Sequence, residues 1–172
     1  MINPMTKIQL ADEQHVASII DVCTAGYRFA SKDILPDAYV KRRCEEFYHT
    51  ERVTKEVQQV TQAWGGYFVA LENHQVIGAG GGGLISEKSA EVFVLYLDPI
   101  RRNLGIGSKL LQAITNQQKD FGAHEQWVSV QKGNQKAIPF YEARGFEFQQ
   151  EVSSFESKLT DQVKSMRYRR DI

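Results

Sequence analysis

One stretch of the chain restricts the fold more than any other: a strand pattern, a short basic turn with two glycines, and an amphipathic helix follow one another directly. Residues 91–97 (EVFVLYL) are typical of a buried strand, which Asp98 and Pro99 end. Gly105 and Gly107 then open a helix with its apolar residues on one face, and Gly122 is a natural C-terminal stop. The stretch predicts a strand, a glycine loop and a helix in direct succession.

Such a junction suits an anionic ligand. The first backbone amides of a helix have no internal partner, and with the helix dipole they form an anion site. Glycines let a phosphate approach closely, and Arg102 adds positive charge at the rim. Spacing alone leaves two interpretations open, a phosphate site or an ordinary loop with solvated arginines.

A second glycine-rich stretch, residues 76–85 (VIGAGGGGLI), has Gly78, Gly80 and Gly83 at the spacing of a dinucleotide-binding loop. That motif must lead directly into a helix, whereas here a polar turn at 86–89 and another strand follow. An NAD-dependent oxidoreductase is therefore a weak hypothesis. We expect a hairpin strand. Its glycines either leave it weakly held by side-chain packing or make it a bare backbone wall beside a ligand.

The remaining pattern mixes strands and helices in one domain, residues 1–172. Besides the elements above, strands are expected at residues 7–10, 66–71, 126–130, 146–148 and 164–169, with a hairpin loop at 72–75. Helices are expected after a cap at Asp12, across residues 40–47, from a cap at Thr50 through Val60, and between Asn134 and Gly145, where Pro139 must lie in the first turn.

Composition excludes several classes of function. Lysine plus arginine and aspartate plus glutamate both number 21, so no net charge draws the chain toward nucleic acid. No window approaches the ~20 apolar residues of a membrane span, and no signal peptide is present, which predicts a cytoplasmic protein without a membrane partner. The scattered histidines and the two cysteines, Cys23 and Cys44, lack metal-ligand spacing, so no metal is expected. Oligomeric state is open, a homodimer being the commonest possibility.

Two blocks of sequence resemble the GNAT superfamily of acyl-CoA-dependent N-acyltransferases. Residues 102–107 (RNLGIG) fit the family's R/Q-x-x-G-x-G/A loop, and residues 134–146 fit its second block, N-x-x-A-x-x-F-Y-x-x-x-G-F. With the order of elements, the resemblance covers residues 6–170; it departs at Asn103, where relatives commonly carry glycine. The implied fold is α/β (α+β), with a central mixed, mostly antiparallel sheet of about seven strands, splayed at the acyl-CoA site and flanked by helices.

The resemblance also implies acetyl-CoA as co-substrate and assigns its binding residues. The pantetheine arm would pair with main-chain groups where the strand at 91–97 splays from the one at 127–130, with Asn134 nearby. The pyrophosphate would lie on backbone amides beside the Arg102 side chain. The implied residues are Leu95, Tyr96 and Leu97 for pantetheine, and Arg102, Asn103, Leu104, Gly105, Ile106, Gly107 and Ser108 for pyrophosphate.

Two residues are candidates for proton transfer. The Tyr141 hydroxyl would donate a proton to the departing thiolate; the alternative is a core aromatic packed with Phe140. An alkyl amine has a pKa of ~10.4 and must lose a proton before it attacks. Glu91 is the candidate base, because it stands eleven residues before Arg102, as in several relatives. The alternative is a solvated glutamate with deprotonation through ordered water. The Leu97 amide would stabilise the oxyanion.

The implied activity is N-acetyl transfer from acetyl-CoA to a primary amine by direct attack in a ternary complex. The acceptor is a small-molecule or peptide amine, with polyamine, amino acid and protein N-terminus all open. In the family it is chosen mainly by the regions here at 27–48 and 151–160. The alternative from another class is a non-catalytic acyl-CoA-binding sensor or regulatory module, against which the presence of Tyr141 and Glu91 argues.

Overall fold

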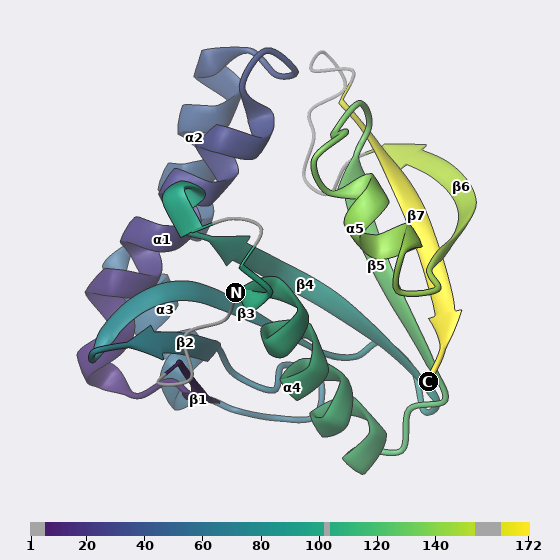
Figure 1. The fold of residues 1–172 in the computed structure, drawn as a ribbon, viewed down its shortest axis with the longest axis horizontal. Helices are drawn as coiled ribbons and strands as arrows, with labels where there is room; N and C mark the ends of the chain where they lie inside the picture. Colours follow the sequence, from purple (N-terminus) through teal and green to yellow (C-terminus); the bar gives the residue numbers. More distant parts are fainter. Residues whose placement is uncertain (1–5, 102–103, 154–162) are drawn as a thin grey trace.

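A seven-stranded sheet organises the part of the chain that the computed structural model describes, residues 6–101, 104–153 and 163–172 (Figure 1). The strand order is β1-β2-β3-β4-β5-β7-β6. Only β4 and β5 run parallel, and the other neighbouring pairs are antiparallel, which confirms the mixed sheet that the resemblance implies. The strands are β1 (Lys7–Leu10), β2 (Phe68–Glu72), β3 (Gln75–Leu84), β4 (Ser89–Leu97), β5 (Glu125–Gln131), β6 (Glu147–Ser153) and β7 (Lys164–Asp171).

Helices cover both faces of the sheet. The helices are α1 (Val16–Ser31), α2 (Asp37–Phe47), α3 (Thr50–Gln58), α4 (Ile106–Asp120) and α5 (Ile138–Glu142), with short 3-10 turns η1 (Glu13–His15) and η2 (Pro99–Arg101). In Figure 1, α1 and α3 lie on one side of β2, β3 and β4, and α4 crosses the other side. The short α5 packs over β5 and β7 on the face that α4 also covers.

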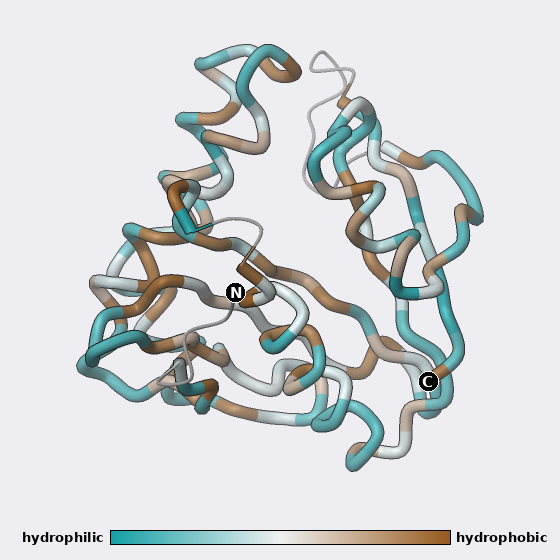
Figure 2. The backbone as a smooth tube through the Cα atoms, in the orientation of Figure 1, coloured by the Kyte–Doolittle hydropathy of each residue, from teal (hydrophilic) through white to brown (hydrophobic). Residues whose placement is uncertain are grey.

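The core has one part on each face. On the α1 face, Ile19, Val53 and Val69 are fully buried against one another. On the α4 face, Ile114 and Val128 belong to a cluster that α4, α5, β5 and β7 share. Figure 2 shows the apolar residues along the strands and the inward sides of the helices, with polar residues on the outer turns. Each such buried side chain contributes about 1.5–3 kcal/mol, so the packing fixes the strand register.

Two expected helix starts differ from the structure. Asp12 caps the η1 turn, where it accepts a hydrogen bond from Gln14 N at 3.0 Å, and α1 itself begins at Val16. The cap of α3 is His49 rather than Thr50, because the His49 Nδ1 accepts from the backbone N–H of Arg52 at 3.4 Å.

Two loop predictions also need correction. The helix α3 ends at Gln58, so Val60 lies beyond it and is 47% exposed. The expected loop at 72–75 is a tighter turn, because Asn73 and His74 adopt positive φ values of 51° and 67° and let the strands run to Glu72 and Gln75.

The glycine-rich strand β3 lets another part of the chain lie against its backbone. A Cβ on Gly83 would come within 2.2 Å of the Ala63 oxygen, and one on Gly81 within 2.5 Å of the Gly66 oxygen. The two segments are hydrogen-bonded, since Gly65 N donates to Gly82 O at 2.7 Å. Residues 61–66 therefore cover the wall that the sequence suggested as a ligand surface.

Candidate active site

The parallel strands β4 and β5 separate partway along their length. Their paired residues run from Ser89 with Glu125 to Val92 with Val128 and then stop. The next residue, Phe93, is a bulge, because β3 pairs Gly82 with Val92 and Gly81 with Val94. A bulge bends its strand and increases the local twist. Phe93 is thus the point at which β4 turns away from β5.

Beyond the bulge, alternate residues of β4 present their backbone to the gap. Asp98 N donates to Ile77 O at 2.9 Å, so Asp98 faces β3. In an antiparallel pair, every second residue bonds to the same neighbour. The backbone of Tyr96 therefore faces β3 as well, and the backbones of Leu95 and Leu97 face the gap. Of the three residues predicted to bind pantetheine, two offer main-chain groups and Tyr96 offers its side chain.

A cavity of about 90 Å³ lies in this gap and reaches both faces of the sheet. Tyr27, Ala30 and Ser31 of α1 line it on one side, and Asn134 and Tyr141 on the other. Residues 92–96 of β4 and 128–131 of β5 form its walls. The cavity brings together four of the predicted site residues, which are Leu95, Tyr96, Asn134 and Tyr141.

Tyr141 is both a core aromatic and a cavity residue. It is 7% exposed, and its ring packs edge-on against Phe140 at 5.1 Å and Phe146 at 5.3 Å between centroids. Burial raises the pKa of its phenol well above the ordinary value. Within the described part of the chain, its hydroxyl has no hydrogen-bond partner. The group is therefore protonated and available as a donor.

Asn134 starts the turn that leads into α5. Its Oδ1 accepts hydrogen bonds from the backbone N–H groups of Lys136 and Ala137, both at 3.1 Å. The helix begins at Ile138, which places Pro139 in the first turn, as its missing N–H requires. Because the Oδ1 is used for capping, the Nδ2 is the Asn134 group that remains for a ligand at the cavity.

The N-terminus of α4 presents free backbone amides. Gly105 is the N-cap, with a left-handed φ of 79° and no side-chain cap. Lys109 N is the first amide that bonds within the helix, to Gly105 O at 3.3 Å, so the amides of Ile106, Gly107 and Ser108 have no helical acceptor. Leu104 packs into the core beside Ile106. Arg102 and Asn103 lie outside the described residues.

Arg144 joins α4 to α5, a connection that the sequence did not indicate. Its Nε donates to Ser108 Oγ at 3.0 Å and its Nη1 to Phe140 O at 2.7 Å. Its guanidinium also stacks on the Phe140 ring at 3.8 Å. Gly107 permits this packing, since a Cβ there would lie 3.2 Å from the same ring. The free amides of α4 and Tyr141 of α5 are thus held in one unit.

Glu91 lies apart from the cavity lining. Its carboxylate pairs with Arg167 Nη1 at 2.8 Å, and the two side chains are only 14% and 18% exposed. Arg167 also donates to Ser129 Oγ at 2.8 Å and stacks on Trp127. Glu91 precedes the bulge, where β4 still pairs with β5. The structure therefore does not bring its carboxylate into the cavity with Tyr141, and sequence analysis gave no sign of its arginine partner.

In the described ranges, no three histidine, cysteine or acidic side chains are grouped so as to hold a metal ion. Among the same residues, no helix combines the length and the apolar character that crossing a membrane demands.

The sheet order, the separation of β4 from β5 and the glycine-started helix beside the gap form the architecture of an N-acetyltransferase fold. Residues 32–146, more than half of the chain, match the acetyltransferase (GNAT) family, and the chain belongs to this family. The match includes both sequence blocks from which the resemblance was inferred. No curated protein sequence matches the chain significantly.

Solved structures share the fold at low sequence identity. The PaiA N-acetyltransferase from Thermoplasma acidophilum, solved with coenzyme A, is 21% identical with a TM-score of 0.79, and the alignment covers 94% of this chain and 97% of that one. A GCN5-related N-acetyltransferase from Rhodopseudomonas palustris is 13% identical, with a TM-score of 0.80 and coverage of 100% and 99%. The ribosomal-protein-S18-alanine N-acetyltransferase from Escherichia coli is 15% identical, with a TM-score of 0.67 and coverage of 98% and 94%.

Proposed function

We propose that the protein transfers the acetyl group of acetyl-CoA to a primary amine by direct attack in a ternary complex. The observation that carries this proposal is the cavity between β4 and β5, which is lined by a protonated tyrosine and by backbone groups without strand partners. Family membership supports the reaction class. The acceptor is a small-molecule or peptide amine.

Coenzyme A would occupy the gap as a missing strand. Its pantetheine amides match the unpaired backbone groups of Leu95 and Leu97 and the Nδ2 of Asn134. Its pyrophosphate would lie on the free amides that begin α4, with Asn103, Leu104 and Gly105 leading in and the Arg102 side chain adding charge. The structural similarity to a protein crystallised with coenzyme A supports this placement.

The chemistry needs three functions at the thioester. The Leu97 amide faces the gap and would donate to the oxyanion that forms when the amine attacks the carbonyl. The sulfur leaves as the carbon–sulfur bond breaks, and the Tyr141 hydroxyl gives it a proton. Glu91 would accept the amine proton through ordered water, because its carboxylate lies outside the cavity lining. Deprotonation by solvent alone is the alternative.

A single assay tests the proposal. The protein is incubated with acetyl-CoA and a panel of amines, and free thiol is measured over time. Thiol release that depends on both substrates and accompanies an acetylated amine supports the enzyme. Binding of acetyl-CoA, seen as a higher thermal midpoint, without thiol release from any amine would instead indicate the sensor module.

A further inference from the structure

A second hollow adjoins the cavity on the side of α1. It lies between the end of α1 and the start of α2 and has a volume of about 520 Å³. Ser31 lines both the hollow and the cavity, so both border the last turn of α1. The residues that line the hollow are Arg28, Phe29, Ser31, Lys32, Asp37, Val40 and Lys41.

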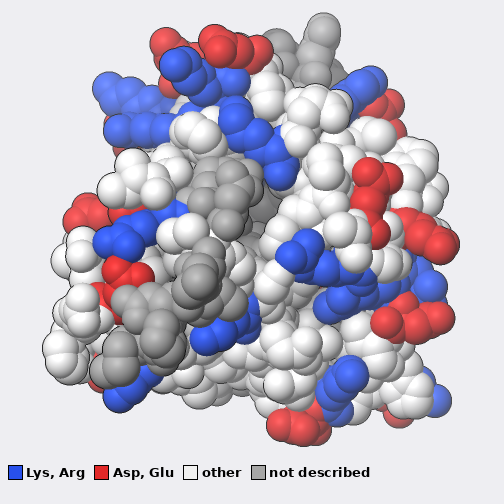
Figure 3. All heavy atoms as spheres, viewed as in Figure 1, with Lys and Arg blue, Asp and Glu red and all other residues white. Residues whose placement is uncertain are grey.

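The charge of this hollow is mainly positive. Three cationic side chains and one carboxylate line it, a net charge of +2. Arg28 and Lys32 pair with no carboxylate among the described residues, and Lys41 approaches Glu45 only at 4.0 Å on an exposed surface. Figure 3 shows lysine and arginine side chains gathered over α2, at the upper left of the molecule.

The walls strengthen the effect of this charge. Phe29 and Val40 are apolar, and a cleft with low-dielectric walls and charge of one sign concentrates its field. A guanidinium such as that of Arg28 matches a carboxylate in geometry as well as in charge. A polyamine in this position would meet repulsion from three cations, with Asp37 alone opposing them.

We propose that the hollow binds a carboxylate of the acceptor while the acceptor's amine enters the cavity past Ser31. The inference rests on the proposed acetyl transfer and specifies its substrate class as amines that also carry a carboxylate. The source of that carboxylate is an amino acid or an acidic peptide. Polycationic amines are the disfavoured class.

Matched acceptors provide the test. With saturating acetyl-CoA, kcat/KM is measured for Ala-Glu-amide, Ala-Gln-amide and Ala-Lys-amide, and separately for 4-aminobutyrate and its amide. Within the peptide or the small-molecule arm, the carboxylate should raise kcat/KM about tenfold over the neutral amide, and added salt should reduce this preference. Equal or faster turnover of the neutral amide in both arms, or of Ala-Lys-amide in the peptide arm, would overturn the inference and leave acetyl transfer intact.

Variants assign the preference to the hollow. Lys32→Gln and Arg28→Gln should each lower the ratio of acid to amide turnover about fivefold. Lys119→Gln, which removes the same charge from the last turn of α4, should keep the ratio. If Lys119→Gln lowered the ratio as much as Lys32→Gln, the preference would reflect net charge and the proposed site would be wrong.

Direct binding separates this inference from the proposed function. Glutarate is added to the protein with acetyl-CoA already saturating, and the thermal midpoint is compared with that in glutaramide. A rise with glutarate that Lys32→Gln abolishes supports the carboxylate site even if no amine is acetylated, in which case acetyl transfer alone fails. No difference between glutarate and glutaramide would overturn the site.

Discussion

Tyr141 lies where the aromatic core around α5 reaches the cavity. Its ring packs in the core, as the structural interpretation of its sequence position expected, and the residue also lines the cavity, while its role as proton donor stays a prediction. Because burial raises the pKa of the phenol above its ordinary value, the hydroxyl keeps its proton throughout the neutral and mildly basic range. A buried phenol of this kind suits an acid that acts once in each turnover.

Replacing Tyr141 with phenylalanine should lower kcat about 100-fold and leave the KM for acetyl-CoA nearly unchanged. The ring remains in the core, and only the proton donor is lost. Steady-state kinetics at several acetyl-CoA concentrations measure both constants. Tyr168→Phe is the matched control, because Tyr168 is buried in the same cluster and does not line the cavity. A kcat for Tyr141→Phe equal to that of the control would exclude the acid role.

Glu91→Gln should lower kcat about 100-fold if the carboxylate accepts the amine proton. The value of kcat is measured for both proteins with one acceptor at saturating acetyl-CoA. Glu125→Gln is the control, because Glu125 lies on the neighbouring strand and also pairs with an arginine. A kcat for Glu91→Gln equal to that of the control would assign deprotonation to solvent.

Two predicted site residues from one contiguous motif lie together in the structure. Asn134 and Tyr141 were placed by one block of sequence, and both line the cavity. The partners of these motifs were not visible, because Arg144 reaches Ser108 across 36 positions and Arg167 reaches Glu91 from the last strand. Such contacts depend on which side chains the fold brings together, and a linear pattern does not record them.

At the scale of elements, α4 and α5 are joined into one unit by Arg144. Arg144 bonds Ser108 in the first turn of α4 and the Phe140 carbonyl in α5. Replacing it with methionine should raise the KM for acetyl-CoA about tenfold with a smaller change in kcat, because the free amides lose their fixed position relative to Tyr141. Kinetics of Arg144→Met, Ser108→Ala and the double variant test this. Strictly additive effects would mean that the contact has no role.

The strand elements were predicted more reliably than their irregularities. Residues 91–97 are almost entirely apolar, so their pattern gave no indication that Phe93 is a bulge. The glycines of β3 were correctly placed in a strand. Their role is to let the backbone of Ala63 and Gly66 approach β3, and these two residues belong to no recognisable motif. Close approach between two backbones leaves no mark in the sequence beyond the absence of side chains.

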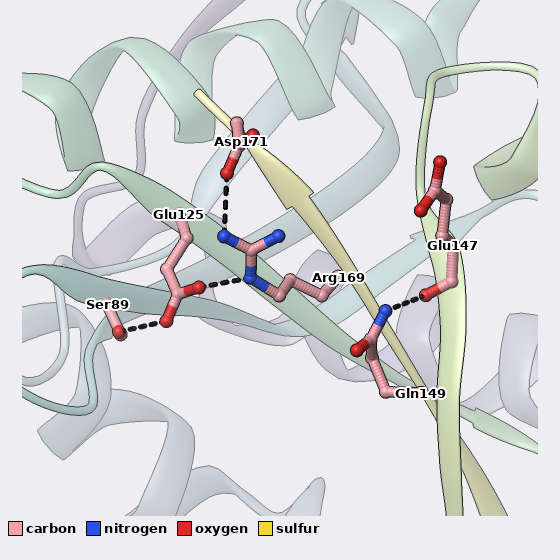
Figure 4. Close-up of polar contacts among 6 residues, drawn as sticks. All are labelled: Ser89, Glu125, Glu147, Gln149, Arg169 and Asp171. Carbon is pink, nitrogen blue, oxygen red and sulfur yellow. Dashed lines mark hydrogen bonds and ion pairs between the residues drawn. The ribbon is translucent and has the colours of Figure 1, made fainter.

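At the scale of the whole molecule, the two parts of the sheet are joined where β4 and β5 begin. Glu125 accepts hydrogen bonds there from Ser89 at 2.5 Å and from Arg169, which also binds Asp171 (Figure 4). From α4, the Gln118 Nε2 donates to the backbone oxygen of Glu91 at 2.9 Å. The Gln126 Nε2 of β5 donates to the Gln118 Oε1 at 2.8 Å. These contacts hold the strands together before the gap opens.

Acid should weaken this junction. Hydrogen bonds from Ser89 and Arg169 lower the pKa of Glu125 from 4.5 to about 2. The stabilisation is complete above pH 4.5 and is lost as the pH falls toward 2, about 1 kcal/mol after solvent screening. Chemical denaturation at pH 7 and at pH 2.5 measures the loss. It should be smaller in Glu125→Gln, and equal losses in both proteins would contradict the assignment.

The general architecture was predictable because its units are local. Each helix and strand has its own periodicity, and the family resemblance supplied their arrangement in a mixed sheet. The region in which we propose that the acceptor binds was not predictable in the same way. Its character depends on which of the mixed charges on α1 and α2, such as Lys32 and Asp37, share a hollow.

The separation of β4 from β5 has a consequence for how this protein tolerates change. A ligand held by the peptide groups of Leu95 and Leu97 would be recognised independently of their side chains. Many substitutions on that strand would therefore leave the affinity for acetyl-CoA unchanged as long as the backbone conformation is preserved. The hollow between α1 and α2, where we propose that the acceptor binds, is lined by side chains, and a single replacement there would alter which amines bind. Under the proposed function, donor choice would therefore tolerate mutation, whereas acceptor choice would change with single substitutions.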